Sequence, residues 1–233
     1  MSKFYKILSI LLIIIFSGCR KNIDDMGLNE KVLSEILPAI VDSYCVDIRV
    51  YHNPPPKYGQ LIFDKNGNYV RTDTTKATLV EIQKFKDWKS KLKEIEKDTS
   101  EIIIAFDPKI LPFELEDAII KDSYFTKDTL QERLTVDKRK PYVLKFEQIT
   151  LNGKFKLKNI NEFDKKNIFE VKYNFNFSGI LTVSGIKFDK KRENGVLDVA
   201  FLCGRLCGYG GKVFIKNVNR KWRIIKMEET WIS

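Results

Sequence analysis

Along most of the second half of the chain, apolar and polar residues alternate with a period of two. Successive side chains of a strand point to opposite faces of a sheet, so this alternation predicts strands with one buried face. A series of such strands, separated by turn-forming residues, predicts an antiparallel sheet. The alternating segments are 142–146, 155–157, 171–177, 180–188, 197–203, 213–215 and 222–224.

The last three segments are joined by short connections and predict a β-meander that closes the chain. The connection Cys-Gly-Arg-Leu-Cys-Gly-Tyr-Gly-Gly, from Cys203 to Gly211, holds four of the twelve glycines of the chain. Glycine reaches positive φ without a steric penalty, so this connection is expected to turn tightly. Glycine-rich loops that cradle phosphate lead into a helix, whereas this one leads into a strand, which disfavours phosphate binding.

Two stretches of the first half have a helical period instead. Residues 29–44 place apolar side chains on one stripe, with Asn29 as the expected cap and with Pro38 predicting a kink or two short helices. Residues 78–97 form a second amphipathic stretch, which begins with a Thr-x-x-Glu capping box. Because neither helix can bury its apolar face alone, we expect both to pack on the sheet.

Short strands are expected between and after these helices, at 45–51, 59–63, 69–71 and 101–106. The second and third of them flank the hairpin turn Lys65-Asn66-Gly67. The predicted fold class is therefore α+β, with N-terminal helices and short strands packed on a C-terminal antiparallel β-meander. We expect one domain over residues 29–233, and the weakly patterned stretch 123–140 is where a sub-boundary would fall.

The N-terminus has the pattern of a bacterial export signal. Lys3 and Lys6 precede a mostly apolar run over 7–16, and the small residues Ser17 and Gly18 follow it. This pattern predicts a signal peptide over residues 1–18, since the apolar run is shorter than the roughly twenty residues of a membrane span.

Phe-Ser-Gly-Cys, ending at Cys19, resembles the bacterial lipobox, in which the cysteine is acylated and becomes the first residue. Phe16 departs from the usual leucine, and the alternative is an ordinary signal peptide with an incidental cysteine. Lipidation of Cys19 predicts an outer-membrane anchor in the cell envelope, followed by a polar tether over 19–28.

The charge of the chain gives weaker information about partners. Removal of residues 1–18 takes away two lysines and lowers the formal net charge from +10 to +8. The remaining charge is spread along strands and a helix, with no arginine-rich arm and no nucleic-acid motif, so we expect no nucleic-acid partner. The predicted partner is the membrane, through the lipid anchor, together with a protein or small molecule that the sequence does not identify.

Cys203 and Cys207 are four residues apart, which is about 13 Å in an extended strand and too far for a disulfide. Gly204 and Gly208 supply the backbone freedom to bring them together, and an exported protein meets an oxidising environment. We therefore predict a disulfide that closes a very short loop. The alternative is two packed, reduced cysteines, and no metal is expected because the chain holds a single histidine.

The C-terminal segment is similar to the C-terminus of uncharacterised secreted proteins and lipoproteins of Bacteroidota. It carries Cys-Gly-x-x-Cys-Gly-x-Gly, then Lys-Trp-x-Ile, then a terminal Thr-Trp-Ile-Ser. Arg220 stands where similar proteins usually have glycine in the turn before Lys-Trp. The resemblance covers about the last fifty residues and implies an envelope address without a known activity. The matching residues are Cys203, Gly204, Cys207, Gly208, Gly210, Lys221, Trp222, Ile224, Thr230, Trp231, Ile232 and Ser233.

The residues of the chain are compatible with two function classes. The single histidine, His52, has no nucleophile motif nearby, and no dinucleotide, phosphate or calcium loop is present, so no cofactor is expected. The first class is a non-catalytic binding protein, with Arg205, Leu206 and Tyr209 as the exposed contact tip of the C-terminal sheet. The alternative is an envelope hydrolase whose carboxylates converge in a deep pocket.

Overall fold

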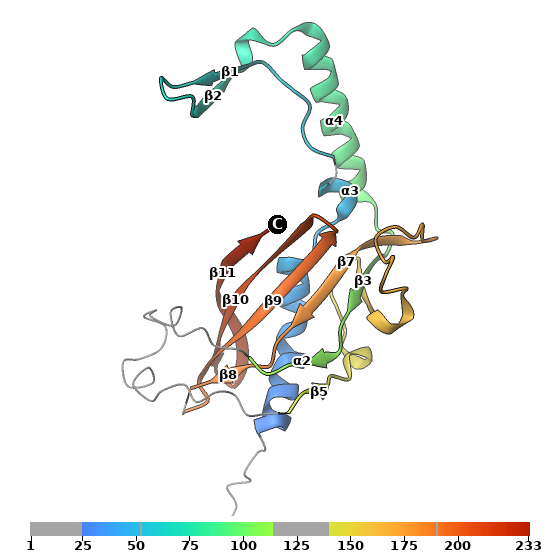
Figure 1. Ribbon diagram of the computed structural model, residues 1–233, viewed down its shortest axis with the longest axis vertical. Helices are drawn as coiled ribbons and strands as arrows, with labels where there is room; N and C mark the ends of the chain where they lie inside the picture. Colours follow the sequence, from blue (N-terminus) through green and yellow to red (C-terminus); the bar gives the residue numbers. More distant parts are fainter. Residues whose placement is uncertain (1–24, 52, 114–139, 190) are drawn as a thin grey trace, which may run out of the picture.

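The computed structural model describes residues 25–51, 53–113, 140–189 and 191–233. A long helix, α2 (Asp25–Tyr44), lies behind a seven-stranded sheet, and a second long helix, α4 (Leu79–Lys97), stands away from that sheet (Figure 1). This arrangement confirms the α+β class predicted from the sequence.

The C-terminal meander is present as three long antiparallel strands. They are β9 (Asn194–Gly204), β10 (Cys207–Val218) and β11 (Lys221–Ile232). The other strands of the large sheet are β3 (Ile102–Phe106), β6 (Phe155–Asn159), β7 (Asn176–Val183) and β8 (Lys187–Phe188). Their spatial order is β11-β10-β9-β7-β3-β6, with β8 beside β9.

The sheet is mixed, whereas the sequence predicted an antiparallel sheet built from the second half. Strand β3 comes from the first half and lies between β6 and β7, parallel to both. All five of its residues are buried. A continuous apolar strand of this kind suits a position covered on both faces, which explains why it lies inside the sheet.

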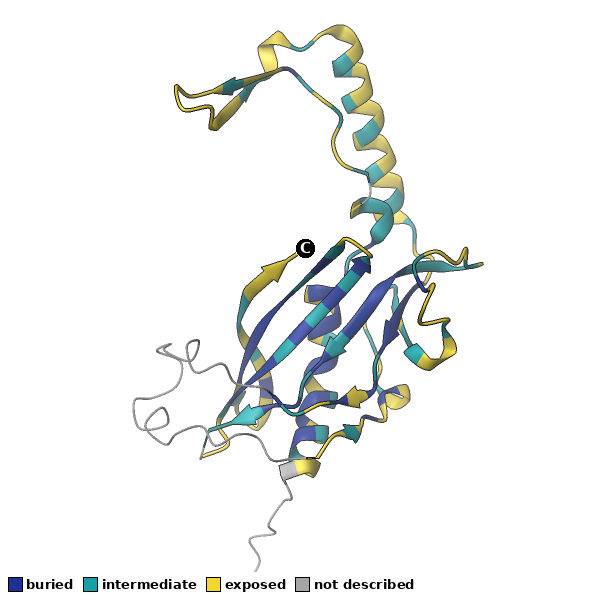
Figure 2. Ribbon diagram, in the orientation of Figure 1, coloured by how far each residue is buried: buried dark blue, intermediate teal, exposed yellow. Residues whose placement is uncertain are grey.

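The main core lies between α2 and one face of the sheet. The apolar stripe of the helix contacts inward-facing side chains of β3, β7, β9 and β10, and Figure 2 shows the buried ribbon of α2 behind the strands. The helix is continuous through Pro38 and is not divided into two. The fully buried or nearly buried helix residues are Val32, Leu33, Ile36, Leu37, Ile40 and Val41.

Asn29 is a buried core residue and not the expected helix cap. Helix α2 begins four residues earlier, at Asp25, so the predicted tether does not extend to residue 28. The Asn29 amide donates to the carbonyl of Ile186 at 2.8 Å and its oxygen accepts from the Ile186 amide at 3.0 Å. The Tyr142 hydroxyl donates to the same oxygen at 3.1 Å. Asn29 thereby joins the helix to the strand region and to β5 (Tyr142–Val143), which pairs with β4 (Lys109–Ile110).

Residues 57–98 form an arm that projects from the domain (Figure 1). It consists of the hairpin β1 (Gln60–Phe63) and β2 (Tyr69–Asp73), the short helix η1 (Thr74–Lys76) and α4. The predicted hairpin and capping box are both confirmed. The expected packing of α4 on the sheet is wrong, because α4 contains no buried residue. Its apolar stripe is instead partly covered by the proline-rich segment before the hairpin, where Tyr58 stacks on Phe85 at 4.5 Å and Trp88 donates to the Asn53 carbonyl at 2.7 Å.

The base of the arm is fixed by ion pairs. Residues 45–51 were expected to be a strand, but they contain the short helix α3 (Ile48–Tyr51). Asp47, which is 8% exposed, pairs with Arg49 at 2.8 Å and with Lys154 at 2.7 Å, and Arg49 also pairs with Asp98 just beyond α4. Burial alone would raise the pKa of Asp47, but the hydrogen bonds from Arg49 and Lys154 outweigh it and hold this pKa below its usual value.

A smaller core lies on the opposite face of the sheet. Ala105, Ile168 and Ile180 are buried there beneath aromatic side chains of residues 160–177. The segment 171–177 was expected to be a regular strand, but strand β7 begins only at Asn176. Rings of this segment gather around Phe163, which explains their alternating spacing without a strand. The remaining short helices are η2 (Phe146–Gln148) and η3 (Ile160–Glu162).

Several predictions fall outside the residues that the structure describes. They are the signal peptide over 1–18, the lipidation of Cys19 with the first part of the tether, and most of the weakly patterned stretch 123–140. Within the four described ranges, no helix combines the length and the apolar character that crossing a membrane requires.

Candidate functional site

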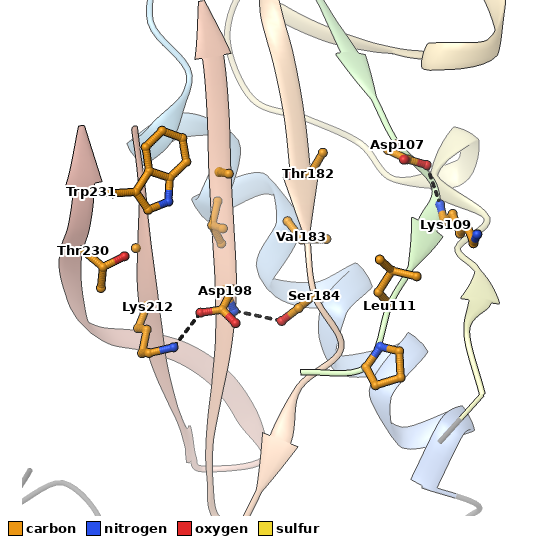
Figure 3. A pocket seen from close by; sticks show the side chains of 14 residues that line it. Asp107, Lys109, Leu111, Thr182, Val183, Ser184, Asp198, Lys212, Thr230 and Trp231 are labelled. Carbon is orange, nitrogen blue, oxygen red and sulfur yellow. Dashed lines mark hydrogen bonds and ion pairs between the residues drawn. The ribbon is translucent and has the colours of Figure 1, made fainter. Parts of the chain in front are cut away.

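A cavity of about 710 Å³ opens on the face of the sheet that α2 leaves uncovered (Figure 3). Its floor is formed by β7, β9 and β10. One wall is the segment 107–112 that follows β3, and the other is the end of β11. The volume is within the range of about 300–1,000 Å³ that is typical of small-molecule sites.

Strand alternation places the polar lining of this cavity. Leu197, Val199 and Phe201 of β9 contribute side chains to the core with α2. Asp198 and Ala200 alternate with them, so their side chains point to the opposite face. Antiparallel pairing then sets Lys212 opposite Asp198. The same alternation that builds the core therefore delivers a charged pair to the cavity.

Lys212 is an almost buried ammonium group. Its side chain is 9% exposed, and its Nζ lies 2.8 Å from Oδ1 of Asp198. The same Nζ lies 4.7 Å from the ring centroid of Phe113, which adds a cation–π contact. Asp198 is 41% exposed, so the pair presents its carboxylate side to the cavity and keeps its ammonium inside.

Hydroxyl groups extend the polar surface between the two walls. The Ser184 Oγ donates to the Gly185 carbonyl and accepts from the backbone amide of Asp198, each at 2.9 Å. The Thr230 hydroxyl donates to the Gly210 carbonyl at 3.3 Å. Thr182 adds a third hydroxyl between them, since it pairs with Ala200 on the floor.

Trp231 closes the cavity on the side of β11. In Figure 3 its indole reaches from the end of β11 across the neighbouring strand toward the cavity. A Cβ atom on Gly210, its partner in the strand pair, would lie only 2.5 Å from Nε1 of this ring. Glycine at 210 is therefore required for the indole to rest directly against the backbone of β10. Trp231 remains 40% exposed in that position.

The cysteine-containing connection is shorter than the sequence suggested. Gly208, Gly210 and Gly211 lie inside β10, and the turn consists of Arg205 and Leu206 alone. A disulfide joins Cys203 to Cys207, with the Cα atoms 5.1 Å apart. Cys207 pairs with Gly204 across a tight hairpin, and the register shift just after Cys207 leaves Cys203 unpaired beside it, which brings the two cysteines together.

The structure separates the predicted contact residues. Arg205 and Leu206 lie at the exposed tip, where Arg205 forms an ion pair with Glu170. Tyr209 lies inside β10, and its hydroxyl donates to the carbonyl of Tyr44 at the end of α2. Burial raises the pKa of Tyr209 to about 12. Tyr209 is therefore a residue that joins the helix to the sheet and not part of an exposed tip.

The arrangement around the cavity does not assemble a carboxylate pair for hydrolysis. Asp107 and Asp198 both line the cavity, but Asp107 accepts from the backbone amide of Lys109 at 2.9 Å while Asp198 pairs with Lys212. Figure 3 shows the two carboxylates on different sides of the cavity, directed at these different partners. Paired catalytic carboxylates instead flank one reacting bond.

Within the part of the chain that the structure describes, neither the Cys45 thiol nor a cluster of metal ligands offers a reaction centre. Cys45 is buried, and burial raises the pKa of its thiol far above the usual range, so it remains protonated. Among the described residues, no group of three or more histidine, cysteine, aspartate or glutamate side chains is placed to hold a metal ion. His52 lies outside the described residues.

Comparisons of the chain with models of protein families, with curated proteins and with solved structures find no match. The geometry of the cavity is therefore the basis for inferring what this chain does.

Proposed function

We propose that the protein is a lipid-anchored cell-envelope protein that binds a small polar ligand without transforming it. The cavity on the open face of the sheet is the binding site. The observation that carries this proposal is a cavity of about 710 Å³ that is lined by an ion pair, three hydroxyl groups and an exposed indole. A few fixed polar groups beside an aromatic ring are typical of ligand sites.

The site is preorganised for binding. Lys212 and Asp198 hold each other in place, Ser184 is fixed by two hydrogen bonds, and Trp231 rests against Gly210. A ligand therefore meets side chains that lose little further freedom when it binds, which favours affinity.

Thermal unfolding of the purified full-length protein tests this proposal. The probes are four classes of small polar molecules: neutral disaccharides, amino acids, dicarboxylates and nucleosides. A molecule that binds only the folded state raises the melting temperature, and at one hundred times its Kd it stabilises by about 2.7 kcal/mol.

The matched variants are Ala200→Phe, which fills the floor of the cavity, and Lys216→Ala, which changes an exposed residue of β10 outside it. We expect one class to stabilise the wild type and Lys216→Ala but not Ala200→Phe. Absence of stabilisation by all four classes would refute binding at this site. Turnover of a bound probe that Asp198→Asn abolishes would favour the hydrolase alternative.

The envelope location is tested separately. It is supported by the signal pattern before Cys19 and by the resemblance of the C-terminal segment to Bacteroidota lipoproteins. Cys19→Ala should move the protein from the membrane pellet to the soluble fraction after cell lysis. A variant that still sediments with membranes after a high-salt wash would contradict lipid anchoring.

A further inference from the structure

We infer that the ligand is a neutral saccharide and that Trp231 is the surface on which one sugar ring stacks. This inference rests on the proposed binding function and names the ligand class of the same cavity. It follows from the position of the indole, the charge balance of the lining and the kind of hydrogen-bonding groups present.

The indole of Trp231 is held where a flat ligand can reach it. It lies against the backbone of Gly210 and lines the cavity, and the residue is 40% exposed. One side of the Trp231 ring therefore packs on backbone, and part of its remaining apolar surface is in contact with water. The negative ring face attracts the slightly positive C–H groups that cover one face of a sugar ring. Stacking would remove both apolar surfaces from water.

The charges of the lining cancel. Asp107 and Asp198 contribute two negative charges, and Lys109 and Lys212 contribute two positive charges. Lys212 is already paired with Asp198 at 2.8 Å. A phosphate or a nucleotide would require an excess of positive charge, as nucleic-acid sites show. A neutral ligand leaves this balance undisturbed.

The polar groups of the lining match hydroxyl groups in particular. The Ser184 and Thr230 hydroxyls donate to the Gly185 and Gly210 carbonyls, so they can act toward a ligand only as acceptors, as the carboxylate oxygens do, while the Thr182 hydroxyl lines the same cavity. A sugar presents several hydroxyl groups that can donate to such acceptor oxygens. These groups lie beside the floor of the cavity, where the small side chain of Ala200 leaves room above the sheet.

A zwitterionic ligand is the strongest competing class, because an amino acid also presents balanced charges. It would need the ammonium of Lys212 and the carboxylate of Asp198 to separate, although they form a close ion pair. It would also gain little from the indole. The two classes therefore predict different effects of removing the aromatic ring.

Isothermal titration calorimetry of the purified full-length protein with cellobiose, maltose, lactose and chitobiose tests the inference, with glycine and alanine as zwitterionic probes. We expect saturable binding of at least one disaccharide and none of the amino acids. Trp231→Ala should weaken that binding at least tenfold, whereas Trp231→Phe, which keeps an aromatic face, should weaken it less. Trp88→Phe, on the arm, is the control and should bind like the wild type.

The outcomes separate the inference from the proposed function on which it rests. Circular dichroism shows whether Trp231→Ala folds. If it does not, the test uses Trp231→Phe and Gly210→Ala instead, because a Cβ at position 210 displaces the indole. Disaccharide binding that is unchanged in these variants would overturn the stacking role. Binding of amino acids alone, lost in Ala200→Phe, would overturn the saccharide inference and leave the binding function intact. Absence of disaccharide binding would overturn the saccharide inference, and the proposed binding function would fall with it only if dicarboxylates, nucleosides and amino acids also failed to bind.

Discussion

Replacement of Asn29 by alanine should be among the most destabilising substitutions of a polar residue in this protein. The side chain is fully buried, and it satisfies both backbone groups of Ile186, which lies 157 residues further along the chain. Alanine would remove both of these hydrogen bonds to Ile186 in the core. A typical intramolecular hydrogen bond contributes about 0.5–1.5 kcal/mol to stability.

Loss of the two hydrogen bonds predicts a fall of about 1–3 kcal/mol in the free energy of unfolding, and entry of water into the space left by the amide would move the value toward the lower end. Tyr142→Phe removes the 3.1 Å hydrogen bond to the Asn29 oxygen, and loss of this bond should cost about 0.5–1.5 kcal/mol. Because a typical domain is stable by only about 5–15 kcal/mol, the alanine variant should still fold but unfold at much lower denaturant.

Urea denaturation followed by circular dichroism measures these differences. The control is Asn161→Ala, at an exposed asparagine, which should change stability by less than about 0.5 kcal/mol. The slope of the unfolding free energy with urea should stay constant across the variants, since the folded state remains compact. A loss below about 1 kcal/mol for Asn29→Ala at unchanged slope would refute the assignment of this asparagine as the partner of Ile186.

Three further predictions concern the core, the arm base and the hairpin. Leu37→Ala should cost about 2–5 kcal/mol as a cavity-forming core substitution, whereas Trp88→Ala on the arm should cost clearly less; equal shifts in melting temperature would contradict the separation of the arm from the core. The lowered pKa of Asp47 contributes stability that is present above the ordinary pKa of 3.8 and is lost as the pH falls through the folded-state pKa. Asp47→Asn should therefore flatten the fall of melting temperature below about pH 4, and an unchanged acid profile would show that the carboxylate contributes nothing. Reduction of the Cys203–Cys207 disulfide should lower stability by about 2 kcal/mol, because the loop is so short, and a loss above about 4 kcal/mol would require a different explanation.

Local signals in the sequence predicted local structure well. The Lys65-Asn66-Gly67 turn and the Thr78–Glu81 capping box are each complete within a few residues, and both are present in the structure. The strand predicted over residues 45–51 is wrong. The alternation of its side chains favours a strand, but Asp47 forms an ion pair with Lys154, a residue 107 positions away that local sequence does not reveal. The apolar stripe of α4 predicted burial, but the stripe alone does not specify what covers it.

The candidate site depends on register, which the sequence does not supply. Asp198 and Lys212 face each other only because the turn contains two residues and the pairing shifts just after Cys207. Tyr209 was expected at an exposed tip because the glycines around it suggested a longer loop. In the sequence, Trp231 belongs only to the C-terminal resemblance, and its contact with Gly210 depends on the pairing between β10 and β11.

The contact between α2 and β11 affects the order in which the chain can complete its fold. The Glu35 carboxylate accepts from the backbone amide of Trp222 at 2.9 Å, across 187 residues of sequence. A ribosome makes α2 before β11, so the apolar stripe of α2 has no complete cover until β11 has emerged. Contacts this distant in sequence form slowly because loop closure must precede them. The nascent helix therefore exposes its apolar stripe while the strands that cover it are being made, which makes it a target for holding chaperones.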